Sequence, residues 1–261
     1  MKSVSRILSL LLLAALPFTL FSQGMTIVAA YMKVAPARES DYLQVENEWK
    51  KIHQKAIEEG VYNGWQLYRK LHAGDHDPYQ YITLQWYNNY EQTFGENAPE
   101  NWQEGIYSDE EWTALMVKTL ASRVRAYESV HHLVTMSDTV KPIKYLVIGE
   151  MKVKPGMQED YVNMEKEVAK TYMDEYIKRD MLSYWGIWSI WPYNEGQPRY
   201  HAVQGFRDAA QLAAGTEMLP PSEVGLDYTM EEVMELMQKT REIVAVEVWE
   251  LVDQVWPEAQ E

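Results

Sequence analysis

Residues 28–51, VAAYMKVAPARESDYLQVENEWKK, decide the fold, because residues 147–170, VIGEMKVKPGMQEDYVNMEKEVAK, repeat them without a gap. Both stretches contain Met-Lys-Val-x-Pro followed by Asp-Tyr, and Glu46 falls on Glu165. A fixed internal period of this kind marks a duplicated structural unit, which must be recognised before any single motif is interpreted.

The similarity continues beyond these stretches. After one inserted residue Trp65 falls on Trp185, and near the ends Arg123 falls on Arg241. Residues 137–144, which contain Pro142, have the composition of a linker. We therefore expect a first repeat over residues 23–136 and a second over residues 145–261.

Each copy carries the same predicted order of elements. A run rich in β-branched residues that ends at a proline predicts a strand, apolar residues at helical spacing predict a long helix, and two strands follow around a turn. Capping boxes, Ser108-x-x-Glu111 and Thr229-x-x-Glu232, start a second helix before a last strand. The order β-α-β-β-α-β, twice, predicts an α+β protein with two tandem ferredoxin-like repeats. Their two sheets can cover each other and form an intramolecular barrel.

The N-terminus predicts a secretory signal peptide over residues 1–22. Lys2 and Arg6 precede an apolar run from Ile7 to Leu20. The alternative is a membrane anchor, but the run is short for a span and contains Pro17. No other segment is long and apolar enough, so we expect an exported protein, periplasmic or secreted, that leaves the membrane after cleavage.

Composition excludes several function classes. The 261 residues are 46% hydrophobic, which supports a packed core, and carry a net charge of −15, which argues against nucleic-acid binding. The chain has no cysteine, so disulfides, thiol nucleophiles and cysteine-ligated metals are excluded. It also lacks a nucleophile elbow, a P-loop and a dinucleotide-binding glycine turn.

In its repeated strand-MKV-x-P-turn-helix opening and its closing strand Val248–Val252, the chain resembles the dimeric α/β-barrel superfamily in tandem form. That superfamily includes cofactor-independent antibiotic-biosynthesis-type monooxygenases, small-molecule isomerases, haem enzymes of the chlorite dismutase type and NIPSNAP-like proteins. The resemblance implies a ligand pocket between the helices and the sheet of each unit. It carries over no catalytic residue.

Four side chains are candidates for proton transfer. The first is Glu46, whose counterpart Glu165 holds the same helix position in the second copy. A carboxylate there could have a raised pKa and act as a base, although a solvated helix edge is the interpretation that the pattern favours. His53 lies on or beside the same apolar face, and its predicted counterpart is Tyr172. A packed or half-exposed side chain is the interpretation that the pattern favours for His53.

Tyr81 and His201 are the other two candidates, on the third strand of each copy. We predict that they occupy equivalent positions in a shared kind of pocket, with ordinary strand packing as the alternative. The proton-transfer set is therefore Glu46, His53, Tyr81 and His201.

Aromatic residues are abundant, with ten Trp and eighteen Tyr. Trp and Tyr combine a large apolar area with one polar group, which suits either a pocket for a flat ligand or a bulky barrel core. The predicted ligand-binding residues are Trp49, Trp65, Trp86, Glu165, Tyr172, Trp185 and Trp188.

Two loops and one hairpin complete the candidates. Gly95–Tyr107 and Gly215–Tyr228 are long connections that could cover a pocket entrance. The hairpin His72–Asp77 holds two histidines and two aspartates, but glycine and aspartate are what a turn requires. His131 and His132 should point to opposite faces of a strand. We predict no metal site.

The sequence thus predicts an exported protein that binds a small apolar or aromatic ligand. Its chemistry would be that of a cofactor-independent oxygenase or isomerase. Self-association through the barrel is a further possibility that the sequence does not decide. The alternatives are a non-enzymatic binding or assembly module of the periplasm and, through the resemblance alone, a haem-binding protein. No cofactor is predicted.

Overall fold

The computed structural model describes residues 24–95, 101–191 and 200–257. The predicted signal peptide lies outside this range. The first half of the chain contains β1 (Thr26–Val34), α1 (Glu39–Glu58), β2 (Gly64–Lys70), β3 (Tyr81–Tyr87), the 3₁₀ turn η2 (Glu91–Phe94), α2 (Asp109–Ser122) and β4 (Arg123–Met136).

The second half has the same order with additional turns. It contains β5 (Tyr145–Val153), α3 (Gln158–Met164), the π-helical segment η3 (Glu165–Ala169), α4 (Lys170–Lys178), β6 (Tyr184–Trp191), β7 (Tyr200–Phe206), α5 (Ala209–Ala214), the 3₁₀ turn η4 (Pro221–Val224), α6 (Met230–Thr240) and β8 (Arg241–Val255). Both predicted capping boxes are present, at Ser108 and at Thr229. We did not predict α5 or η4.

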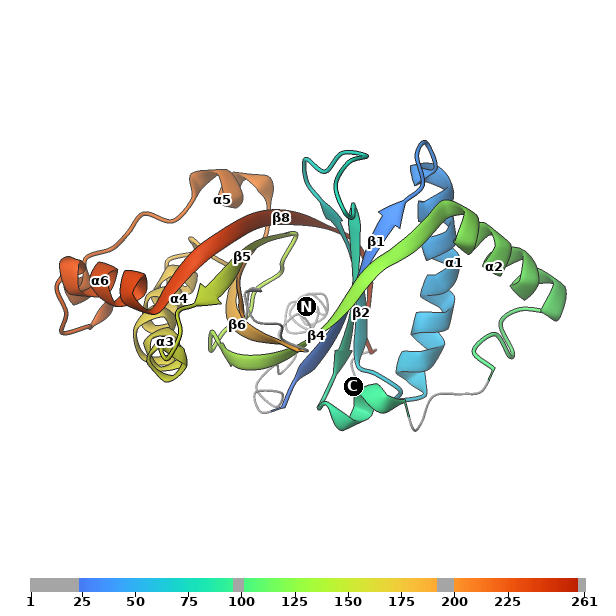
Figure 1. Ribbon diagram of the computed structural model, residues 1–261. Coiled ribbons are helices and arrows are strands. Elements are labelled where there is room, and N and C mark those ends of the chain that lie inside the picture. The colour runs from blue at the N-terminus through green and yellow to red at the C-terminus, as the bar shows by residue number, and fades with distance from the viewer. Residues whose placement is uncertain (1–23, 96–100, 192–199, 258–261) are drawn as a thin grey trace, which may run out of the picture.

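The eight strands form one closed antiparallel barrel in the order β1-β3-β2-β8-β5-β7-β6-β4. Each half contributes four strands, and the halves meet where β2 pairs with β8 and where β4 pairs with β6. Figure 1 shows α1 and α2 on one side of the barrel and α3, α4 and α6 on the opposite side. The predicted α+β class is confirmed.

Because side chains alternate across each strand, the barrel has an inner and an outer apolar face. The buried side chains form three clusters. The first helix layer packs α1 on the outer face and includes Tyr42 and Trp65. The barrel interior includes Trp188 and Trp249. The second helix layer packs α3 and α4 on the outer face of the second half and includes Trp185.

The inserted residue of the second half lies inside its helix. The π-helical segment Glu165–Ala169 absorbs it, since a π-turn holds one residue more than an α-turn. Beyond this segment the buried positions Ile52, Ala56 and Ile57 of α1 correspond to Tyr172, Tyr176 and Ile177 of α4. The predicted pairing of His53 with Tyr172 is therefore wrong by one residue, and Tyr172 takes the place of Ile52.

The predicted pairing of Tyr81 with His201 is also wrong by one residue. Tyr81 lies opposite Met32 in the sheet, and the residue opposite Met151 is Tyr200. A shift of one residue moves a strand side chain to the other face. Consequently Tyr81 faces the first helix layer, whereas His201 points into the barrel interior.

Candidate functional site

A buried carboxylate lies between helix and sheet in both halves. In the first helix layer the residue Glu46 is 2% exposed, and the Arg123 Nε donates a 2.8 Å hydrogen bond to its Oε1. Glu46 comes from the middle of α1 and Arg123 from the first residue of β4. The favoured interpretation of Glu46 as a solvated helix edge is wrong, because Arg123 supplies the counter-charge that allows burial.

The second helix layer holds the same pair in a looser geometry. Glu165 is also 2% exposed, but its Oε1 lies 3.6 Å from the Arg241 Nε, beyond hydrogen-bond distance. Both atoms are buried without a hydrogen-bond partner in the described part of the chain. Glu165 is the first residue of the π-helical segment, so the inserted residue lies at the loosened pair.

Burial changes the acidity of both carboxyl groups. Burial raises the pKa of Glu165 to about 6, against the lowering effect of Arg241 and of Tyr161. Burial also raises the pKa of Glu46, opposed by Arg123. A carboxylate with a pKa near the working pH is suited to proton transfer, and in this respect Glu165 is the better candidate.

Each carboxylate has a tyrosine one helical turn before it. The hydroxyls of Tyr42 and of Tyr161 are buried and make no hydrogen bond of ordinary geometry within the described residues. Each ring packs against a tyrosine of the third strand, with centroids 4.7 Å apart for Tyr42 and Tyr81 and 4.9 Å for Tyr161 and Tyr200. Buried polar groups without partners are costly and mark places where a polar ligand or water can bind.

Tyr81 and His53 do not join the Glu46 pair. The Tyr81 hydroxyl donates to the Glu39 carboxylate at 2.5 Å. The His53 Nδ1 lies 2.5 Å from the Tyr62 hydroxyl, and its ring stacks on Trp65 with centroids 4.7 Å apart. Burial of the imidazole lowers its pKa to about 3, so His53 is neutral and a weak base.

The predicted tryptophans divide between the three clusters. Trp65 and Trp185 are at most 2% exposed, at equivalent places under α1 and α4. The Trp49 Nε1 donates to Thr119 at 3.1 Å. Trp86 and Trp188, in contrast, lie in the barrel interior, with ring centroids 5.7 Å apart. They are therefore separated by the sheet from both helix layers.

The second helix layer contains one more buried hydroxyl without a hydrogen bond, and a connecting segment packs over it. The hydroxyl of Tyr172 is buried without a partner among the described residues. Leu219, from the connection predicted as a lid, packs into the same cluster. Glycines in the left-handed region, Gly215 (φ 66°) and Gly225 (φ 83°), flank this segment, where a Cβ would be strained.

His201 belongs to a different environment. Its ring lies 5.0 Å from that of His131, centroid to centroid, inside the barrel. Burial lowers the pKa of His201 to about 4 and holds that of His131 far below its usual value. His132 contacts Thr26 instead, so the two neighbouring histidines diverge as predicted. A proton-transfer role for His201 beside Glu46 or Tyr81 is inconsistent with this separation.

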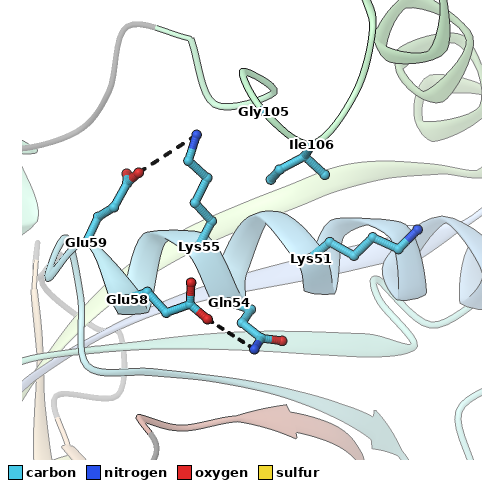
Figure 2. A pocket seen from close by; sticks show the side chains of 7 residues that line it. All are labelled: Lys51, Gln54, Lys55, Glu58, Glu59, Gly105 and Ile106. Carbon is cyan, nitrogen blue, oxygen red and sulfur yellow. Dashed lines mark hydrogen bonds and ion pairs between the residues drawn. The ribbon is translucent and has the colours of Figure 1, made fainter.

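Other features do not form a site. Figure 2 shows a surface cleft over α1, in which Lys55 lies 3.8 Å from Glu59 and the Gln54 amide donates a 3.1 Å hydrogen bond to Glu58. Among the described residues no group of three metal-ligating side chains comes together. Across the same residues, no helix has the length and apolar character needed to cross a membrane.

Comparison with known proteins bears on the fold. No protein-family model and no curated protein matches the chain. A candidate monooxygenase from Lactobacillus acidophilus NCFM has a similar solved structure, with a TM-score of 0.53 and 10% identity over 90% of this chain and 97% of that one. An anthrone oxidase-like protein matches with a TM-score of 0.52 and 10% identity over 89% and 92% of the two chains.

A candidate chlorite dismutase matches less closely, with a TM-score of 0.47 and 13% identity over 88% of this chain and 95% of that chain. The first two likenesses show that the chain has the fold of the dimeric α/β-barrel superfamily, as the resemblance implied. At identities this low the similarity shows the fold alone, and function has to be inferred from the side chains of this chain.

Arg123, Arg241 and Tyr161 were not among the predicted site residues. Arg123 and Arg241 align between the copies, and this alignment was the available signal. A charged residue that recurs at the start of a closing strand has to find a counter-charge if its side chain turns inward. Glu46 and Glu165, which recur on the first helix of each copy, supply that counter-charge to Arg123 and Arg241 respectively.

Proposed function

We propose that this protein is an exported small-molecule-binding protein whose working site is the second helix layer, where Glu165 accepts a proton from the ligand. One observation carries the proposal. The atoms Glu165 Oε1 and Arg241 Nε are buried, lie 3.6 Å apart and have no hydrogen-bond partner among the described residues, whereas the equivalent atoms of Glu46 and Arg123 are joined by a 2.8 Å hydrogen bond. The same pair is closed in one half and open in the other.

The unpartnered groups define the ligand's chemistry. Arg241 Nε and the hydroxyls of Tyr161 and Tyr172 can donate hydrogen bonds to an oxygen, while the Glu165 carboxylate can accept a proton. A phenol, an enol or a carbonyl compound with an acidic C–H offers both features. The buried indole of Trp185 supplies an apolar wall.

These residues fit a cofactor-independent oxygenase or isomerase. Transfer of a proton to Glu165 would leave an enolate or phenolate, whose negative charge Arg241 and the tyrosine hydroxyls would stabilise. In an isomerase the proton returns to another atom of the ligand. In an oxygenase the electron-rich anion reacts with dioxygen. The names of two structural neighbours, a candidate monooxygenase and an anthrone oxidase-like protein, agree with this class.

The helix layers do not fit a haem. The second half has one histidine, His201, and it points into the barrel interior rather than toward α3 and α4. In the first half His53 is held between Tyr62 and the face of Trp65. Ligation of iron by His53 would cost both contacts, so we derive no step through this cofactor.

The first half, with its closed ion pair, is a structural copy in this proposal. We also propose that both halves arose from one duplicated ferredoxin-like unit, that residues 1–22 direct export, and that residues 137–144 link the repeats. A non-enzymatic binding module is the second candidate. It is favoured by the packed state of the first helix layer, in which Glu46 and Arg123 need no ligand.

Anthrone is a suitable first probe, because it is flat, apolar and has acidic C–H bonds beside a carbonyl. Binding would be followed by quenching of tryptophan fluorescence, and oxidation to anthraquinone and water by consumption of dioxygen. Glu165→Gln should abolish oxidation, and Glu46→Gln, its matched control, should retain it. Oxidation that persists in Glu165→Gln would refute the proposed base. Binding without oxidation in the wild-type protein would favour the non-enzymatic candidate.

A further inference from the structure

A second group of side chains, inside the barrel, has chemistry that the proposed ligand site does not use. Tyr31, Tyr79, Tyr127 and Trp249 bring their rings together around the carboxylate of Glu247. This tyrosine cluster is separated from both helix layers by the sheet, since its buried members belong to the barrel interior.

The rings of the tyrosine cluster are in continuous contact. Tyr31 stacks on Tyr127 with centroids 4.0 Å apart, meets Tyr79 edge-on at 4.8 Å, and lies 6.3 Å from Trp249. Tyr79 and Tyr127 are 5.7 Å apart. Tyr127 is 46% exposed, whereas Tyr31 and Tyr79 are at most 3% exposed. The cluster thus leads from a solvent-accessible ring to buried ones.

Tyr79 has a proton acceptor within this cluster. Its hydroxyl donates to Glu247 Oε2 at 2.5 Å, and the same carboxylate accepts from Trp249 Nε1 at 2.9 Å and pairs with Lys70 at 2.9 Å. Burial opposes ionisation of Glu247, but these hydrogen bonds outweigh it and lower its pKa. Burial and the carboxylate raise the pKa of Tyr79. At neutral pH the pair is therefore a phenol bonded to a carboxylate.

We propose that Tyr79 is a redox-active tyrosine, and that the tyrosine cluster draws oxidising equivalents from the surface at Tyr127 to Tyr79. Loss of an electron makes a phenol strongly acidic, so its oxidation is easiest where a base can take the proton at once. Glu247 is placed to do so, and the ring contacts provide the route for the electron.

The reaction balances with a peroxyl radical as the oxidant. The radical takes one electron through Tyr127, and Tyr79 supplies that electron. The phenolic O–H bond of Tyr79 breaks, its proton passes to the Glu247 carboxylate, and the peroxide anion takes a proton from solvent. The products are a hydroperoxide, a hydroxide ion in the solvent, a neutral Tyr79 radical and a protonated Glu247.

The test is one-electron oxidation of the full mature protein by photogenerated peroxyl radicals, followed by freezing and electron paramagnetic resonance. We expect a neutral tyrosyl signal that is lost in Tyr79→Phe and reduced in Glu247→Gln. Tyr81→Phe is the matched control, since the Tyr81 hydroxyl also donates to a carboxylate at 2.5 Å, but in the first helix layer. This control should keep the wild-type signal.

The signals are compared only between variants that show a cooperative thermal unfolding transition and are therefore folded. Tyr127→Phe, at an exposed position, leaves the core intact and should slow the appearance of the Tyr79 radical. An unchanged signal in Tyr79→Phe would overturn the proposal, as would its loss in Tyr81→Phe. Because Glu165 takes no part, failure here would leave the proposed ligand site untouched.

Discussion

The two buried glutamates should respond differently to the same substitution. Glu46→Gln removes the charge of a buried carboxylate that is 2.8 Å from the Arg123 Nε. Glu165→Gln removes the charge of a carboxylate that is 3.6 Å from the Arg241 Nε and makes no hydrogen bond through Oε1 within the described residues. The first variant breaks a hydrogen-bonded ion pair, and the second breaks an ion pair that has no hydrogen bond.

The magnitudes follow from the geometry. Removing one partner of a buried ion pair costs about 3–5 kcal/mol, because the other charge stays buried. The amide introduced by Glu46→Gln can still accept one hydrogen bond, and burial raises the pKa of Glu46, so we expect a loss of about 3 kcal/mol in the free energy of unfolding. In a chain of this size that lowers the Tm by about 6–12 °C.

Glu165 has a different balance at neutral pH. Its pKa of about 6 in the folded protein, against 4.5 for the ordinary group, favours the folded state below pH 4.5, and this contribution is lost as the pH rises through 6. Ionised Glu165 therefore costs about 2 kcal/mol at pH 7. Glu165→Gln removes this cost, but it also leaves Arg241 without its counter-charge. Because the two effects offset each other, the free energy of unfolding of Glu165→Gln should lie within about 1 kcal/mol of the wild-type value.

Urea unfolding at pH 7, followed by tryptophan fluorescence, measures both variants. Glu46→Gln should be the less stable of the two variants, by about 2 kcal/mol or more. Equal stabilities, or a larger loss in Glu165→Gln, would refute the distinction between a closed and an open pair.

Three further predictions concern other residues. In the folded protein the pKa of His201 is about 4, against 6.5 for the ordinary group. The neutral imidazole therefore stabilises the fold above pH 6.5, and up to about 3 kcal/mol of this stability is lost as the pH falls to 4. In a series of urea midpoints measured at different pH values, His201→Leu should lose less stability in acid than the wild-type protein. Tyr161→Phe removes an unpartnered hydroxyl and should leave the free energy of unfolding unchanged or raise it by about 1 kcal/mol while anthrone turnover falls; a clear loss of stability would contradict the unpartnered state. Deleting Lys166 should convert the π-helical segment into a regular helix like α1, with the fold kept by circular dichroism and turnover lost, whereas full turnover would show that the inserted residue is not needed.

Much of the fold could be predicted because the two copies of the repeat can be aligned with each other. Two occurrences of one strand-turn-helix opening fix where each unit starts, and the capping boxes at Ser108 and Thr229 fix where the second helices start. The sequence did not show where the inserted residue lies. A helix can absorb it as a π-turn and a hairpin can absorb it as a longer turn, and a gapped alignment does not distinguish the two.

The site was predictable only in part for the same reason. Glu46 and Glu165 precede the insertion, so they were paired correctly. His53 and Tyr172 follow it and were paired one residue out. Tyr81 and His201 were also paired one residue out, because Arg69 pairs with Tyr81 but Ser189 pairs with Tyr200, so the second half is one residue shorter between these strands. In a strand that error changes the face, which is why His201 was assigned to a helix layer and lies inside the barrel. Burial of the glutamates depended on arginines distant in sequence, which no local pattern reveals.

The most direct test of the central claim is a carbon-13 NMR titration of the glutamate side-chain carboxyls, repeated in Glu165→Gln with Glu46→Gln as its control. We predict one carboxyl that titrates near pH 6, is absent from Glu165→Gln and remains in Glu46→Gln. If all carboxyls of the wild-type protein titrate in the ordinary range, or if the one near pH 6 survives in Glu165→Gln, then Glu165 is not the proton acceptor of an open site.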